Sequence, residues 1–194
     1  MRMILASTNR GKFQEMKEQL LPYGIDLIFG GDLPSPPYVE ETGATYEENA
    51  FLKARAWASS AKVPALADDS GLEVDALGGA PGVHSARVVP GKDSARTEWL
   101  LEAIKGADDR SARFVCSIAV VFPDGRSPLA VTEYCAGRIA ASPAGESGFG
   151  YDPVFIPDGY EKTFSELGVD IKNTISHRAK AVKSIAEMLR PVIE

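Results

Sequence analysis

A chain of 194 residues is long enough to bury one substantial hydrophobic core. Hydrophobic residues make up 44% of it and charged residues 25%, which is the profile of an ordinary globular protein. The net charge of -6 argues against a general affinity for nucleic-acid backbones, which requires clustered Lys and Arg. No apolar run approaches the roughly 20 residues of a membrane span, and no signal peptide precedes the first predicted strand. We therefore expect neither nucleic acid nor a membrane among its partners.

The N-terminal half predicts strands alternating with helices. Hydrophobic patterning indicates three strands and a first helix: strands over 3–6, 25–29 and 65–67, and a helix over 12–21. A second helix opens at Thr45 and Glu48, whose T-x-x-E spacing is that of a capping box. Residues 30–43 are rich in Gly, Pro and acidic residues, so they are predicted to form a loop.

The C-terminal half predicts a helix over 94–105, followed by a long hairpin of strands 112–122 and 129–141. Residues 142–160 are dense in Gly and Pro and are expected to be loop. Ser176 is expected to cap a last helix, which Pro191 should end. Because a hairpin excludes a purely parallel sheet, the predicted fold class is α/β with a mixed sheet, in a single domain over 1–194.

The two cysteines lie on the two strands of the hairpin. With a tight turn at Asp124 and Gly125, Cys116 would face Glu133, so the two thiols would be diagonal neighbours and not opposite partners. We interpret Cys116 and Cys135 as reduced thiols of a cytoplasmic protein.

A polar segment between the first strand and the first helix is suited to phosphate. Its six residues are Ser7, Thr8, Asn9, Arg10, Gly11 and Lys12. A turn that enters a helix offers unpaired backbone N–H groups and the positive end of the helix dipole. The G-x-x-x-x-G-K-[ST] spacing of a Walker loop is absent, and the alternative is an ordinary helix N-cap without a function.

Two acidic pairs suggest a site for a hard metal ion. Glu40 and Glu41 precede the second helix, and Asp68 and Asp69 follow the short predicted strand 65–67. Adjacent carboxylates are costly unless a cation or a shared proton relieves them, and Mg²⁺ prefers carboxylate and phosphate oxygens. The alternative for Asp69 is a turn in which its side chain binds its own backbone.

Aromatic and basic residues near the C-terminus are suited to a nucleotide base. Phe149 and Tyr151 offer faces for stacking, Gly150 permits close backbone approach, and Asp152 can accept hydrogen bonds from a base edge. The polar and basic residues further along are Lys172, Ser176, His177 and Arg178. The alternatives are core packing for the aromatic residues and a solvated helix end for the basic ones.

Six motifs, in this order, resemble those of the inosine triphosphate pyrophosphatase family. They are S-T-N-x-x-K, E-E-T-G followed by E-N-A, D-D-S-G-L, G-G-A-P-G-V-x-S-A-R, F-G-Y-D-P and S-H-R. The match covers residues 2 to about 190. The resemblance implies an elongated mixed sheet flanked by helices, with two lobes around a central cleft, in a homodimer.

The resemblance also implies roles for individual residues. Residues 7–12 would bind the triphosphate, with Asn9 and Lys12 as the leading contacts. Glu40 and Asp69 would bind Mg²⁺, with Asp68 and Glu41 in support.

Asp69 would, in addition, be the proton acceptor, with Ser70 beside it on the substrate. The base would contact seven residues: Phe149, Gly150, Tyr151, Asp152, Lys172, His177 and Arg178.

The activity implied is Mg²⁺-dependent hydrolysis of purine nucleoside triphosphates such as ITP, dITP and XTP to the monophosphate and pyrophosphate. Phosphoryl transfer depends mainly on positioning the reacting groups and on neutralising the charge of the phosphate oxygens. A site in which acidic side chains bind a metal ion meets both needs. Three alternatives stay open: a pyrophosphatase for other modified nucleotides, a non-catalytic nucleotide sensor, and a structural or nucleic-acid-binding module.

Overall fold

The structure is a computed structural model that describes residues 1–193. Within that range six strands form one sheet in the hydrogen-bonded order β2-β1-β3-β4-β5-β6. The strands are β1 (Arg2–Leu5), β2 (Asp26–Phe29), β3 (Ala65–Val74), β4 (Ser111–Val121), β5 (Leu129–Ile139) and β6 (Phe155–Pro157). Strand β1 is parallel to β2 and β3, whereas β5 and β6 are antiparallel, so the sheet is mixed as predicted.

The α-helices of the described chain flank this sheet. They are α1 (Arg10–Leu20), α2 (Tyr46–Ala61), α3 (Asp93–Ala103), α4 (Phe164–Ile175) and α5 (His177–Ile193). Contacts divide the chain into two compact units. The first unit comprises Met1–Asp69, Cys116–Glu133 and the residues from Arg178 onward, and the second comprises Ser70–Val115 and Tyr134–His177.

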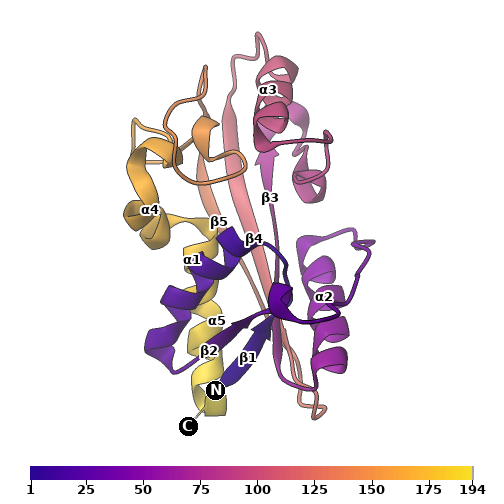
Figure 1. Cartoon of the computed structure of the whole chain (residues 1–194). Helices are drawn as coiled ribbons and strands as arrows, with labels where there is room; N and C mark the ends of the chain where they lie inside the picture. Colours follow the sequence, from indigo (N-terminus) through magenta and orange to yellow (C-terminus); the bar gives the residue numbers. More distant parts are fainter. Residues whose placement is uncertain (194) are drawn as a thin grey trace. The chain divides into compact units, whose positions relative to one another are not determined.

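The first unit packs helices on both faces of its strands (Figure 1). Side chains alternate along β1, so Met3 and Leu5 lie in a core with α1 and α5, whereas Ile4 lies with the alanines and Trp57 of α2. Both cores are shielded from solvent, with Met3, Ile4 and Leu5 each at most 1% exposed. This packing fixes the β1–α1 turn at one end of the parallel strands.

The second unit has an aromatic core of its own. Phe114 of β4 contacts Phe155 of β6 at a ring-centroid distance of 4.6 Å, and Phe155 stacks on Phe164 of α4 at 5.4 Å. Leu100 of α3 and Leu72 of β3 are fully buried in the same cluster. The helix α3 and the segments around β6 are thereby fixed to the same strands.

One strand is longer than the sequence indicated. The prediction ended the third strand at Ala67 and placed the acidic pair just beyond its end, but β3 runs on to Val74, so Asp68 and Asp69 lie inside it. The prediction was wrong because it used polarity as a stop signal. Basic and amide groups compensate the two carboxylates, which are 2% and 6% exposed, and the strand continues through them.

Two C-terminal predictions were also wrong. Pro191 does not end the last helix, because α5 continues to Ile193. A proline near a helix end removes only one hydrogen bond, and no further turns depend on it. The predicted loop over 142–160 instead contains strand β6, and α4, which begins with a capping box at Thr163 and Glu166, follows it. The last helix begins directly after Ser176, where it was expected.

Other sequence predictions are confirmed. The capping box of α2 forms between Thr45 and Glu48. Both cysteines are free and buried, and Ser117 lies 2.7 Å from Thr132 between their Oγ atoms, in agreement with the predicted hairpin register. In the described residues no helix combines the length and apolar character needed to cross a bilayer. The cleft between two lobes stays a prediction.

Candidate active site

The β1–α1 turn carries the segment predicted to bind phosphate. Asn9 is the N-cap of α1, and its Oδ1 accepts a hydrogen bond from the backbone N–H of Lys12 at 3.1 Å. Thr8, Asn9 and Arg10 are exposed, and Ser7, Gly11 and Lys12 are half-buried. Arg10 contacts Asp32 at 3.3 Å. The turn is therefore a true helix N-cap that also presents polar groups to solvent, which is what an anion site at a helix start requires.

Behind this turn, Asp68 is the centre of a buried ion-pair cluster. Lys12 Nζ lies 2.8 Å from Asp68 Oδ2, and Arg178 Nε lies 3.5 Å from the same oxygen. Arg178 also pairs with Glu15 of α1 at 2.6 Å. Burial alone would raise the pKa of Asp68, but Lys12 and Arg178 lower it well below its ordinary value. Asp68 is thus ionised at neutral pH, and it orients Lys12.

A second cluster surrounds Asp69, the predicted proton acceptor. Asn49 of α2 is fully buried, and its Nδ2 donates to Asp69 Oδ2 at 3.1 Å. Lys53, one helical turn further, lies 3.2 Å from Asp69 Oδ1 and 2.6 Å from Glu41 Oε1. The Oδ1 of Asn49 accepts from Gly43 N at 2.8 Å, which ties the E-E-T-G segment to α2.

The two acids of the D-D pair have opposite pKa shifts. Burial raises the pKa of Asp69 above its ordinary value, and the neighbouring Lys53 offsets this only in part. Burial lowers the pKa of Lys53, but Asp69, Asp68 and Glu41 reverse this and raise it. A carboxylate with a raised pKa is suited to accept a proton, whereas its ionised neighbour Asp68 is suited to electrostatic support.

These acids also bear on the predicted metal site. Lys53 Nζ lies between the carboxylates of Glu41 and Asp69, where a cation is evidently favoured, and both groups offer the hard oxygen ligands that Mg²⁺ prefers. Glu40 is exposed, so the carboxylate that shares a cation with Asp69 here is that of Glu41. Among the described residues no three His, Cys, Asp or Glu side chains converge as a ready metal cluster.

The second unit contains the 148–152 loop, which was predicted to bind a base. Asp152 is 2% exposed, and its Oδ2 accepts from Lys172 Nζ at 2.5 Å and from Phe149 N at 2.9 Å. The Lys172 ammonium lies 4.4 Å from the ring centroid of Phe149, in a cation–π contact. Gly148 is required here because a Cβ on it would lie 2.2 Å from Asp152 Oδ2, and its φ is +84°.

Not every predicted base contact lies in an exposed position. Tyr151 is 4% exposed and packs in the aromatic core, so its ring supports the loop and does not present a free face. His177 is 3% exposed and stacks on Phe114 at 4.6 Å with an interplanar angle of 9°. Arg178 belongs to the first unit, where it contacts Asp68, and Ser70 is half-buried on β3.

Three contacts of the site were missed from sequence. From the sequence, Asn49 and Lys53 of the second helix were given no role, although their i, i+4 spacing places both on one face, towards Asp69. Glu15 lies one turn after the phosphate segment, but its partner Arg178 is 163 residues away. No local sequence signal could have shown that pairing.

The sequence profile of the Ham1 family matches residues 3–188. The chain belongs to the Ham1 family. Its resemblance to inosine triphosphate pyrophosphatases is thereby confirmed.

Full-length relatives support this membership of the Ham1 family. A protein of Symbiobacterium thermophilum named dITP/XTP pyrophosphatase is 47% identical over 196 residues, which cover 100% of this chain and 97% of the relative. A protein of Bacillus subtilis with the same name is 45% identical over 190 residues, which cover 96% of this chain and 96% of the relative. Among solved structures, a HAM1 protein of Coxiella burnetii has a TM-score of 0.88 at 41% identity, covering 98% of this chain and 99% of its own. The Ham1 protein of Staphylococcus aureus has a TM-score of 0.88 at 39% identity, covering 99% and 100%.

Proposed function

We propose that this chain hydrolyses the non-standard purine nucleoside triphosphates dITP, XTP and ITP to the monophosphate and pyrophosphate. The enzyme class is that of its relatives, which are named dITP/XTP pyrophosphatases. The observation that carries the proposal is Asp69, a buried carboxylate with a raised pKa, bound by Asn49 and Lys53. Asp69 directly follows Asp68 in the sequence. Asp68 forms an ion pair with Lys12 at the start of α1, in the segment predicted to bind phosphate.

In the proposed reaction, a water molecule attacks the α-phosphorus. The carboxylate of Asp69 accepts the proton of that water, the new oxygen–phosphorus bond forms, and the bond from the α-phosphorus to the bridging oxygen breaks. Pyrophosphate leaves with the electron pair of that bond. Lys12 and the N–H groups at the start of α1 neutralise the oxygen charge that develops, because these donors are in place before the reaction.

We further propose that the activity depends on Mg²⁺. Asp69 and Glu41 offer carboxylate oxygens on either side of one cationic position, and Glu40 is the other predicted ligand on the adjoining loop. When bound, Mg²⁺ supplies charge neutralisation on the triphosphate and orientation of the attacking water. Lys53 would then exchange its contact with Asp69 for one with phosphate.

Base recognition is assigned to the second unit. The Phe149 ring offers a stacking face, and Asp152 fixes the position of Lys172 through a buried ion pair. Hypoxanthine and xanthine have a 6-oxo acceptor where adenine has an amino donor. Donors such as Lys172 and His177 favour the oxo group, and a buried donor left unpaired against adenine penalises ATP.

The test of the activity is release of pyrophosphate from ITP, XTP, dITP, GTP and ATP, with Mg²⁺ and with a chelator. The proposal expects Mg²⁺-dependent release that favours ITP and XTP over ATP and GTP by at least about tenfold. Equal rates on all five substrates would contradict the proposed roles of Phe149, Lys172 and His177 in recognition of the base. Nucleotide binding without any release would favour the sensor alternative. A modified pyrimidine nucleoside triphosphate is assayed alongside the five purines, and release of pyrophosphate from it alone would favour the alternative of a pyrophosphatase for other modified nucleotides.

Hydrolysis in ¹⁸O-labelled water tests the bond that breaks. Attack at the α-phosphorus places the label in the monophosphate, and mass spectrometry of the two products locates it. Label recovered in pyrophosphate would show attack at the β-phosphorus and would contradict the proposed attack at the α-phosphorus.

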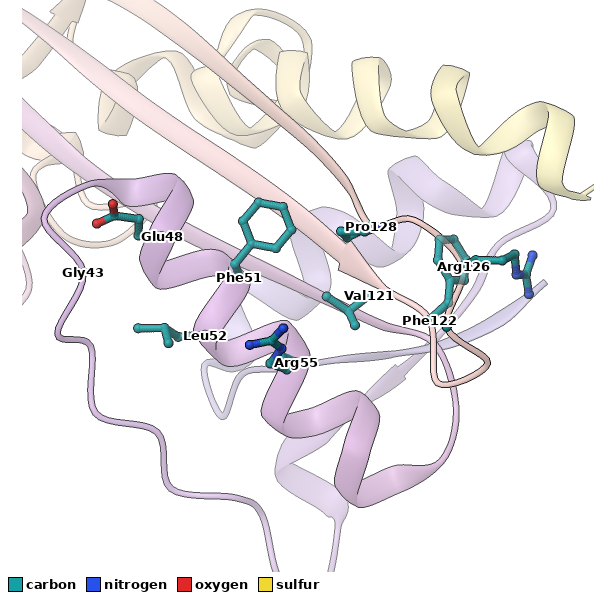
Figure 2. Close-up of a pocket in the computed structure, with 10 residues that line it drawn as sticks. Gly43, Glu48, Phe51, Leu52, Arg55, Val121, Phe122, Arg126 and Pro128 are labelled. Carbon is teal, nitrogen blue, oxygen red and sulfur yellow. The ribbon is translucent and has the colours of Figure 1, made fainter.

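We also propose a homodimer, with α2 in its interface. Four α2 residues line one side of a pocket of about 600 Å³ beside the β4–β5 turn: Glu48, Phe51, Leu52 and Arg55 (Figure 2). Their spacing of i, i+3, i+4 and i+7 gives one stripe, acidic at one end, basic at the other and apolar between. Against a second copy related by a two-fold axis, such a stripe is self-complementary, because Glu48 meets Arg55 of the second copy.

The remaining proposals concern location and other partners. Two free buried thiols support a reducing, cytoplasmic compartment. The net charge of -6 supports a small-molecule substrate over nucleic acid as the partner.

A further inference from the structure

The 148–152 loop of the second unit is fixed at four successive residues by four different groups. Phe149 N is bound by Asp152, and Asp152 by Lys172. Tyr151 OH donates to the carbonyl of Ser85 at 3.0 Å. The remaining residue, Gly150, donates its N–H to Asp93 Oδ2 at 2.6 Å, across 57 positions of sequence. Asp93 belongs to none of the six motifs that led to the family.

The contact to Asp93 determines the orientation of one peptide plane. In a trans peptide the N–H and the preceding C=O point in opposite directions. Gly150 N–H points to Asp93, and the carbonyl of Phe149 accepts from Asp152 N at 3.3 Å. Both ends of the Phe149–Gly150 peptide are therefore bound, and the Phe149 ring attached to it has a defined position under Lys172.

Asp93 is itself oriented for this contact. It is the first residue of α3, where a carboxylate is favoured by the helix dipole. Its other oxygen, Oδ1, binds Arg96 Nη2, and Arg96 Nη1 donates to the carbonyl of Gly91 at 3.0 Å. Because the guanidinium fixes Oδ1, Oδ2 is left facing Gly150 N. The Arg96 side chain is 16% exposed and the Asp93 side chain 45% exposed, so the guanidinium is largely shielded from solvent while the carboxylate remains partly accessible.

We propose that Asp93 is a positioning residue for base recognition, which selects the 6-oxo purine by fixing the Phe149–Gly150 peptide. This rests on the proposed base-binding role of the loop. While the plane is fixed, its N–H and its carbonyl are both engaged by protein groups, so neither competes for the base. A peptide plane released from Asp93 can rotate and turn the Phe149 carbonyl towards the base, where it accepts from the 6-amino group of adenine and repels the 6-oxo group of hypoxanthine. Loss of Asp93 therefore reduces discrimination as well as affinity.

The experiment compares Asp93→Ala with the unchanged protein on ITP and ATP. We expect KM for ITP to rise by roughly tenfold with a much smaller change in kcat, and the ITP-to-ATP ratio of kcat/KM to fall by about as much. The affinity of Asp93→Ala for IMP, which contains the base but no leaving group, should fall by a similar factor when it is measured by calorimetry. Inhibition by inorganic tripolyphosphate, which has no base, stays unchanged.

Two further variants separate positioning from general damage. Asp93→Asn keeps an oxygen that can accept from Gly150 N, and it retains most of the ITP preference. Arg96→Met removes the group that orients Asp93, and it gives an intermediate loss even if Asp93→Ala does not fold. Asp108→Ala, an exposed aspartate of the same unit, is the matched control and leaves the ratio unchanged.

Equal loss on ITP and ATP, or an unchanged ITP-to-ATP ratio in both Asp93→Ala and Arg96→Met, overturns the inference. Either result is distinct from failure of the proposed function, in which the unchanged protein itself releases no pyrophosphate from ITP.

Discussion

Two adjacent aspartates on β3 share a strand but not a chemical environment. Asp69 faces Asn49 and Lys53, and Asp68 faces Lys12 and Arg178. Because side chains alternate along a strand, neighbouring positions point to different faces. The same dipeptide therefore supplies one carboxylate with a raised pKa and one with a lowered pKa.

Replacement of Asp69 tests its role as proton acceptor. Asp69→Asn keeps the shape and an oxygen for Asn49, but an amide cannot accept the proton of water. We expect pyrophosphate release from ITP to fall by at least about a hundredfold, while calorimetry still detects nucleotide binding. Asp26→Asn, an exposed aspartate paired with Arg2, is the control. Substantial activity in Asp69→Asn would remove this residue from the mechanism.

Asp68 gives a pH-dependent contribution to stability. Its pKa in the folded state is below the ordinary value of 3.8, so the contribution is complete above about pH 4 and is lost as the pH falls below it. Asp68→Asn should lower the free energy of unfolding by about 2 kcal/mol at pH 7, and by less at pH 3. Urea unfolding at the two pH values measures both. A deficit that grows on acidification would contradict the ion-pair assignment.

At the scale of elements, the loop 30–43 and α2 meet at Gly43. A Cβ on Gly43 would lie 2.7 Å from Asn49 Oδ1, too close for an ordinary contact. Gly43→Ala should displace Asn49 from Asp69, and we expect kcat to fall by roughly tenfold with little change in the melting temperature. Thr42→Ala, an exposed neighbour, should leave kcat unchanged. A normal kcat in Gly43→Ala would separate Asn49 from catalysis.

The helices and strands were predicted from the sequence only in part. Local signals located the helix at Thr45 and Glu48, but the identical T-x-x-E pattern at Thr163 and Glu166, just after the Gly-rich and Pro-rich region, led to no predicted helix. The strand β3 was cut short because its acids are compensated by residues distant in sequence, which no window reveals. The S-H-R motif indicated Arg178 as a site residue, but its burial against Asp68 depends on tertiary packing.

At the scale of the whole molecule, the α2 stripe predicts a charge-sensitive dimer. Stable interfaces bury about 1,600 Å², more than one helix stripe provides, so Val121 and Pro128 of the adjoining pocket should contribute. Arg55→Glu places like charges opposite each other, and Leu52→Glu charges the apolar centre. We expect both to shift sedimentation velocity profiles towards monomer, and Ser60→Glu, exposed on the same helix but off the stripe, to leave them unchanged. Dimers that persist in both variants would place the interface elsewhere.

Because both thiols are buried, neither should react with thiol-labelling reagents in the native chain. Cys116 is fully buried and Cys135 is 4% exposed, and burial raises the pKa of Cys116 to about 12. Ellman's reagent should therefore react with neither cysteine in the folded protein and with both in urea. A cysteine introduced at Tyr38, whose side chain is 92% exposed, would then accept a fluorescent dye at a single position. Emission from that dye would report on the 30–43 loop during turnover, without removal of any native residue other than Tyr38.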